Sequence, residues 1–244
     1  LDQLNGRSLA QMTFVAVFID GTFFADHTCL LALGIALDGR KVVLGVREGA
    51  SENSELVKDL LASLLERGLV LAKRTLFVLD GSKALGKAVR ETFGECAVIQ
   101  RCILHKRMNV LSYLPPSWHA EAKRRLNAAW GMATHEAALQ ELKKTQRWLK
   151  KISESAAASL DEALEETLTV HRLGITGTLR KTLLTTNPIE SAIEVVKRHA
   201  RRVRRWNGAT MVLRWVGSGL VRAEDQFRRV KGHEKITQLV ASLE

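Results

Sequence analysis

Three consecutive runs of apolar residues near the start of the chain constrain its fold more than any other feature. They are rich in β-branched and aromatic residues and read FVAVFID, HTCLLALGIAL and KVVLGV, between Phe14 and Val46. Asp38-Gly39 separates the second run from the third, and Asp-Gly between apolar runs is a strong hairpin signal. We therefore expect three antiparallel strands, the first of which ends at Asp20.

A helix and a fourth strand follow this meander. Residues Asn53 to Arg67 carry leucines at the helical period, and Gly68 is a typical stop. The next run, TLFVLDG, contains Asp80. A crossover through a helix usually returns the chain parallel to an earlier strand, so the fourth strand should lie beside the first, with Asp20 and Asp80 at the same edge of the sheet.

A helix from Lys83 to Phe93 and a fifth strand, CAVIQ, complete the predicted sheet. After His105 helical patterns dominate, and three amphipathic helices are predicted at 117–133, 137–152 and 160–171. The expected fold class is therefore α/β, with a five-stranded mixed sheet flanked by helices and interrupted by an all-α insertion. The predicted divisions are 1–105 for the first part of the core, 106–182 for the insertion and 183–244 for the last part.

Three acidic residues from separate elements, Asp20, Asp80 and Glu190, are the candidate chemical groups. Mg²⁺ prefers oxygen ligands and is usually bound by one or two carboxylates, and two such ions can clamp both reacting oxygens of a phosphodiester. Glu190 also has a structural interpretation, because Asn187-Pro188-Ile189-Glu190 is typical of a helix start with Asn187 as N-cap and Glu190 as the capping-box acid. The two interpretations are compatible.

Positive charge is concentrated behind Glu190. The whole chain carries a formal charge of +11, and the stretch from Lys197 to Lys231 holds 11 Lys or Arg against 2 acids. A predicted basic helix continues through Val203, and such a surface favours a polyanionic partner. Trp206 could stack on a base, although core packing is favoured for the tryptophans. The predicted DNA-binding residues are Lys197, Arg198, Arg201, Arg202, Arg204, Arg205 and Trp206.

The three cysteines are too few and too irregular for a disulfide framework, which favours a reducing cytoplasm. Cys102-Ile-Leu-His105 invites comparison with a zinc site, but a structural zinc ion needs two further ligands at convincing spacing. No apolar run is long enough for a transmembrane helix, so no membrane association is expected.

With these residues in view, the chain resembles the catalytic region of Mutator-like bacterial insertion-sequence transposases, members of the DDE superfamily with an RNase H-like core. The similar segments cover nearly all of residues 14–235. They are FIDGTFFADHTCLLALGIALDGRKVVLGVREGASEN, LFVLDGSKALGKAVRETFG, VIQRCILHKRMNVLSYLP, SLDEALEETLTVHRLG and TTNPIESAIEVVKRHARRVRRWNGATMVLRWVGSGL.

The resemblance implies that Asp20, Asp80 and Glu190 are the catalytic acids and hold two Mg²⁺ ions, for which Mn²⁺ could substitute. It implies that Cys102 and His105 form the family's Cys-x-x-His signature near the active site. It also implies transposon ends and target duplex DNA as partners, a homodimer, and a bacterial, nucleoid-associated protein. An upstream DNA-binding region is normal in this family, and we expect the present chain to be a fragment that lacks it.

The expected function is cleavage at transposon ends followed by strand transfer, by a two-metal mechanism. Two alternatives remain: a simple RNase H-like nuclease, and a catalytically inactive or truncated fragment that only binds DNA. A helical regulatory protein that binds nucleic acid without a metal is a third. Joined products, metal dependence and binding without cleavage distinguish them.

Overall fold

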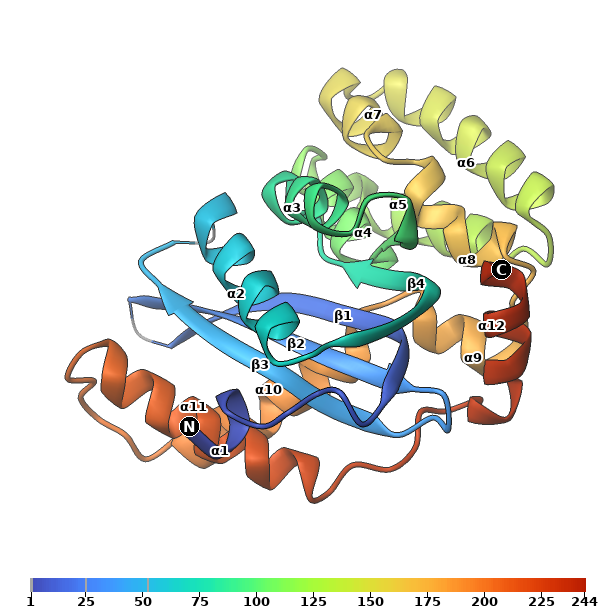
Figure 1. The fold of residues 1–244 in the computed structure, drawn as a ribbon. Coiled ribbons are helices and arrows are strands. Elements are labelled where there is room, and N and C mark those ends of the chain that lie inside the picture. Colours follow the sequence, from blue (N-terminus) through green and yellow to red (C-terminus); the bar gives the residue numbers. More distant parts are fainter. Residues whose placement is uncertain (1, 25, 52) are drawn as a thin grey trace.

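The computed structural model describes residues 2–24, 26–51 and 53–244, and it has a mixed five-stranded sheet at its centre (Figure 1). The strand order is β3-β2-β1-β4-β5. Strands β1, β2 and β3 are antiparallel, whereas β4 is parallel to both β1 and β5. The strands are β1 Thr13–Phe24, β2 His27–Ala36, β3 Lys41–Gly49, β4 Val70–Leu79 and β5 Ala97–Arg101. The predicted α/β fold class is confirmed.

The first strand does not end at Asp20, as the sequence had suggested. Strand β1 continues to Phe24 and pairs with β2 beyond Asp20, through Asp20↔Leu31 to Phe24↔His27. Its parallel pairing with β4 stops earlier, at Ile19↔Leu79. The Asp20-Gly21 dipeptide therefore marks the point where β1 loses one neighbour and keeps the other.

Each face of the sheet is covered by helices with their own buried core. Helices α2 (Ser54–Glu66) and α3 (Lys83–Phe93) pack on one face, against Phe14, Val17 and Ile19 of β1. On the other face, α9 (Gly177–Leu183), α10 (Asn187–Ala200), α11 (Ala209–Glu224) and α12 (Ile236–Leu243) pack against a cluster that includes Phe18. Because both faces are covered, β1 is apolar on both sides rather than alternating.

After β5 the described residues form helices and loops without a strand, and the helices within residues 103–168 surround a third apolar cluster. Helix α4, at Ile103–Ser112, was not predicted. The predicted divisions at 105/106 and 182/183 fall inside α4 and α9. The other elements are α5 His119–Trp130, α6 His135–Lys150, α7 Glu154–Asp161, α8 Thr169–Arg172, the short α1 Asp2–Asn5, and the 3-10 turns Gly94–Cys96, Pro116–Trp118, Glu165–Leu168 and His233–Lys235.

The predicted helix at 160–171 is wrong, because the chain turns between α7 and the Glu165–Leu168 turn. Ala163 has a left-handed backbone, with φ 59°. The buried Lys106 ammonium donates to the carbonyl oxygens of Ser159 at 2.8 Å and Glu162 at 2.7 Å. These bonds satisfy carbonyl groups that the end of α7 leaves without helical partners.

Helix α10 also differs from its prediction at its C-terminal end. It ends at Ala200, so Val203 and the arginines at 201, 202, 204 and 205 lie on a loop rather than on a basic helix. Like charges spaced four apart on a helix repel one another, which disfavours continuing the helix through this sequence. None of the helices that the structure describes combines the length and apolar character needed to cross a lipid bilayer.

Candidate active site

Asp20 and Asp80 come together where the parallel pairing of β1 and β4 stops. Ile19 and Leu79 are the last paired residues, so the two acids are the next residue on each chain. Asp20 is 4% exposed, and its Oδ1 accepts a hydrogen bond from Gly21 N at 3.0 Å. Oδ1 of Asp80 accepts from Ser82 N at 2.8 Å, which closes a tight turn in front of α3. The crossover argument thus placed these two acids at the same edge.

Glu190 reaches this edge from the first turn of α10. Its Oε1 accepts a 2.6 Å hydrogen bond from the Thr186 hydroxyl, and its backbone N–H donates to Thr186 O at 3.0 Å. Asn187 is the first residue of the helix, and its side chain makes no capping bond. The predicted capping box is therefore wrong: the N-cap is Thr186, which makes no side-chain capping bond, and its hydroxyl orients the carboxylate of Glu190 instead.

Cys102 connects the Glu190 segment to the end of β4. Its backbone N–H donates to Leu79 O at 2.8 Å, next to Asp80. Its Sγ accepts from the backbone N–H of Thr186 at 3.4 Å and lies 3.4 Å from the Thr186 hydroxyl oxygen, whose proton is donated to Glu190. Ile103 N also donates to Leu184 O at 3.0 Å. These bonds hold the residues before α10 beside the ends of β4 and β5, so the third acid is fixed near the other two.

The ionisation of Asp20 is influenced by its burial and by the two other carboxylates. Burial raises the pKa of Asp20 to about 7, against an ordinary value of 3.8. The nearby His105 lowers this pKa, while the negative charges of Asp80 and Glu190 raise it further. Clustered carboxylates resist ionisation in this way because each charge opposes the next. A bound cation would relieve the repulsion.

Cys102 and His105 form a polar pair behind the carboxylates. The hydrogen bond with Cys102 raises the pKa of His105 to about 9, and the negative charges of Asp20 and Asp80 act in the same direction. Burial opposes ionisation of Cys102, but hydrogen bonds with His105 and Thr186 outweigh it and lower the thiol pKa. The Thr186 hydroxyl lies 3.4 Å from Nδ1 of His105, so the pair contacts the group that orients Glu190.

The donor set of the three acids suits a hard divalent cation, since it consists of carboxylate oxygens. Among the described residues, the group whose ligand atoms all lie within 4.8 Å of one another is instead Cys102, His105 and Glu190. Two ions set about 3.5–4 Å apart do not require all their ligands to be that close, so the wider spacing of the acids does not argue against them. A closed structural zinc site would need a fourth ligand, and Cys102 and His105 already hydrogen-bond each other.

Arg101 supports the turn that follows Asp80. The arginine is 6% exposed, and its Nη1 lies 3.3 Å from both the Asp80 and the Ser82 carbonyl oxygens. Its Nε donates to Oε2 of Glu166 in the insertion at 2.8 Å. The insertion therefore contributes a counter-charge to the arginine that holds this turn.

The six predicted DNA-binding cations are all exposed, from Lys197 and Arg198 in the last turn of α10 through the loop at 201–205. Within the described part of the chain, none of them forms an ion pair. Trp206 packs edge-on against Phe24 with a centroid distance of 6.0 Å, as favoured for the tryptophans. At 1.5 Å per residue, Lys197 lies roughly 10 Å along α10 from Glu190.

Sequence reasoning missed Thr186 and Arg101. Thr186 lies four residues before Glu190, the spacing at which side chains meet on one helical face, and this signal was available. Arg101 is a single charge at the end of a buried apolar run. This position predicts that the arginine pairs with an acidic residue, but it does not indicate which one. Glu166 is far away in sequence, so its pairing with Arg101 depends on the tertiary fold.

The family described as "Transposase, Mutator family" matches residues 1–230. The chain belongs to the Mutator family of transposases. Among curated relatives, the transposase for insertion sequence element IS6120 of Mycolicibacterium smegmatis is 30% identical over 79% of this chain and 60% of its own length.

Two further relatives are also transposases of insertion sequence elements. The transposase for insertion sequence element IST2 of Acidithiobacillus ferrooxidans is 28% identical over 88% of this chain and 72% of its own length. The transposase for insertion sequence element ISRM5 of Rhizobium meliloti is 30% identical over 83% of this chain and 50% of its own length. The chain thus spans between half and about three quarters of the length of each of these three relatives.

Proposed function

We propose that this chain carries the DNA-cleaving and strand-joining site of a bacterial insertion-sequence transposase. The observation that carries the proposal is the convergence of Asp20, Asp80 and Glu190 at one edge of the sheet. Two of these acids follow the last parallel strand pair, and the third is tied to Leu79 through Thr186 and Cys102. Membership of a transposase family supports the same reaction class.

Asp20, Asp80 and Glu190 would hold two Mg²⁺ ions, or Mn²⁺ in their place. When bound, such ions stabilise negative charge on the attacking and leaving oxygens of a phosphodiester. The protein would contribute the placement of the acids, the Thr186 hydroxyl that orients Glu190, and the exposed cations that hold the phosphate backbone. Cys102 and His105 act here as supporting residues, through their contacts with Thr186.

The proposed reaction has two steps of the same type. In the first, the oxygen of water bonds to phosphorus at a transposon end, the bond from phosphorus to the 3′-oxygen breaks, and a proton completes the new 3′-hydroxyl. In the second, that hydroxyl oxygen bonds to a phosphorus of target DNA and a target 3′-oxygen leaves with a proton. Two ends must be brought together, so the proposal includes a homodimer.

A strand-transfer assay tests this proposal. A labelled duplex that ends in a free 3′-hydroxyl is incubated with plasmid DNA and Mg²⁺, for the unmodified chain and its Asp80→Asn variant. We expect labelled product joined to plasmid with the unmodified chain and none with the variant. Anisotropy titrations should show that both bind the duplex equally.

The rival functions give different results in the same assay. Cuts without joined product would support a simple nuclease. Salt-sensitive binding with neither cuts nor joining, in the unmodified chain, would support a fragment that only binds DNA. Strand joining that persists in the Asp80→Asn variant would show that Asp80 is not part of the active site.

A further inference from the structure

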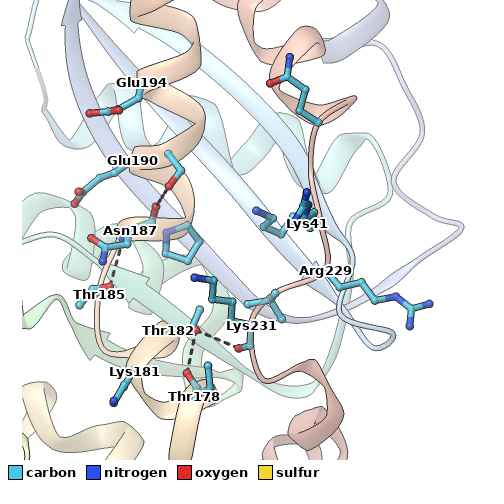
Figure 2. A pocket seen from close by; sticks show the side chains of 15 residues that line it. Lys41, Thr178, Lys181, Thr182, Thr185, Asn187, Glu190, Glu194, Arg229 and Lys231 are labelled. Carbon is cyan, nitrogen blue, oxygen red and sulfur yellow. Dashed lines mark hydrogen bonds between the residues drawn. The ribbon is translucent and has the colours of Figure 1, made fainter.

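A large polar groove opens beside Glu190, near the N-terminal end of α10, whereas the basic loop follows its C-terminal end. Its volume is about 1010 Å³, and its walls are the first turns of α10, helix α9, the start of β3 and the segment 226–231 (Figure 2). Pro188 and Val230 are its apolar lining residues. None of these walls belongs to the stretch of six DNA-binding cations predicted from the sequence.

Five basic side chains line the groove: Lys41, Lys181, Arg228, Arg229 and Lys231. All but Lys41 are exposed. Within the described residues, none of the five lies at ion-pair distance from a carboxylate. The acidic lining residues, Glu190 and Glu194, both lie on α10 at one end of the groove (Figure 2). The rest of the groove is therefore positive and lacks internal counter-charges.

The wall formed by 226–231 is held in place on both sides. Val230 is 3% exposed, and its N–H donates to Gly39 O at 2.9 Å in the β2–β3 turn. The Thr182 hydroxyl of α9 donates to Lys231 O at 3.1 Å. Gly232 has φ 85°, and a Cβ there would lie 2.4 Å from Leu179 N. The groove is thus built on fixed backbone rather than on a free loop.

We propose that this groove binds the sugar-phosphate backbone of a DNA strand that enters the site at Glu190. The proposal deepens the function proposed above and depends on it for the role of Glu190. When unpaired protein cations contact DNA phosphates, the counterions condensed on the DNA are released, which favours binding. The α10 N-terminus at Asn187 adds a partial positive charge in the same place.

A small molecule is a poorer match for this groove. Small-molecule pockets are lined mostly by apolar and aromatic side chains and range from about 300 to 1,000 Å³. This groove lies at the upper end of that range and is lined mostly by charged and hydroxyl side chains. The loop cations at 201–205 lie beyond the C-terminal end of α10 and Asn187 at its N-terminal end, so a DNA backbone could contact both basic surfaces and pass Glu190 between them.

The test compares two doubly substituted chains of equal charge. Lys181→Gln with Lys231→Gln removes two groove cations, whereas the control Lys143→Gln with Lys151→Gln removes two exposed cations from the insertion. Each is titrated by fluorescence anisotropy with a duplex of about 20 base pairs, roughly two helical turns, and with one of its strands, at several salt concentrations. Cleavage kinetics are measured on the same proteins with Mg²⁺.

We expect the groove variant to bind the duplex about tenfold more weakly and to lower the magnitude of the salt slope by roughly 1.4–1.8 for two lost phosphate contacts. The control should change neither. An equal loss with the single strand would assign the groove to one strand, and a loss confined to the duplex would assign it to the duplex. In cleavage, KM should rise while kcat stays within about twofold, because uniform binding is lost.

Equal binding by the groove variant and its control would overturn the proposal. Because the titration requires no cleavage, it separates the two claims. A chain that binds through the groove but never cuts would overturn the proposed function alone. A chain that cuts normally with an unaltered salt slope in the groove variant would overturn the groove alone.

Discussion

The Thr186 hydroxyl determines where the carboxylate of Glu190 points, through its 2.6 Å hydrogen bond to Oε1. Thr186→Val keeps the side-chain shape and removes the donor, whereas Thr186→Ser keeps the donor. Groups that orient metal ligands typically contribute 10–100-fold to activity. We therefore expect Thr186→Val to lower the cleavage rate by about 10–100-fold and Thr186→Ser to retain most of it, measured at saturating DNA. Equal rates for the two variants would contradict this role.

Asp20 makes the fold depend on pH, because its pKa in the folded protein, about 7, is above its ordinary value of 3.8. Between these values the folded state binds the proton more tightly than the unfolded state does. Stability should therefore fall as pH rises through this window and stay low above it. The difference between these two pKa values corresponds to a cost at high pH on the order of 4 kcal/mol.

Asp20→Asn should remove this dependence. In the presence of chelator at about pH 8, we expect the variant to have a higher Tm than the unmodified chain, and near pH 4 the two should converge. Mg²⁺ should then raise the Tm of the unmodified chain at pH 8 and leave the variant unchanged. If the variant is less stable than the unmodified chain at pH 8, ionisation of Asp20 does not destabilise the folded state.

At the scale of elements, the buried Gln100 amide joins the insertion to β5. Nε2 donates to Thr167 O at 2.9 Å, and Oε1 accepts from Val170 N at 2.9 Å. Gln100→Ala leaves two buried backbone groups without partners, at about 1–3 kcal/mol each. We expect a clear loss of free energy of unfolding in urea titrations, together with faster amide exchange at Val170. An unchanged exchange rate there would mean that other contacts hold this junction.

The arginines of the loop at 201–205 should also contribute to the salt dependence of duplex binding. Replacing Arg201, Arg202, Arg204 and Arg205 with Gln should weaken duplex binding and lower the magnitude of the salt slope by as much as about 3.6. Because these side chains are exposed and unpaired among the described residues, the Tm should change little. A large fall in Tm with an unaltered salt slope would assign the loop to folding rather than to DNA.

The sequence predicted elements best where a local signal agreed with the tertiary environment. Helix α3 begins and ends at the predicted Lys83 and Phe93, and the Asp38-Gly39 turn joins β2 to β3 with Gly39 at φ 83°. Predictions failed where distant contacts decide. The break after α7 is supported by Lys106, from another helix. The extension of β1 past Asp20 depends on β2 as its remaining neighbour.

The same distinction holds within the candidate site. The three acids could be chosen from their positions after apolar runs and at a helix start, because these signals are local. Cys102 and His105 were noticed from their spacing but were assigned to the active site only by resemblance. The contact between Cys102 and Thr186 joins residues that are 84 positions apart. Long-range hydrogen bonds of this kind leave no periodic pattern in the sequence.

In the whole molecule, Glu190 lies between two basic surfaces. One is the exposed loop after α10, and the other is the groove beside Glu190. The central proposal is that the three acids form one metal-dependent DNA-cleaving site. Glu190→Gln tests this claim well, because the amide oxygen can still accept from Thr186 while the charge is lost.

The most direct measurement is cleavage of a labelled duplex carrying candidate transposon ends, with Mg²⁺, Mn²⁺ or chelator, by the unmodified chain and by Glu190→Gln. We expect metal-dependent nicking by the unmodified chain and no nicking when chelator is present. The variant should not nick the duplex but should still bind it in anisotropy titrations. Nicking that persists in chelator, or full activity in Glu190→Gln, would contradict the central proposal.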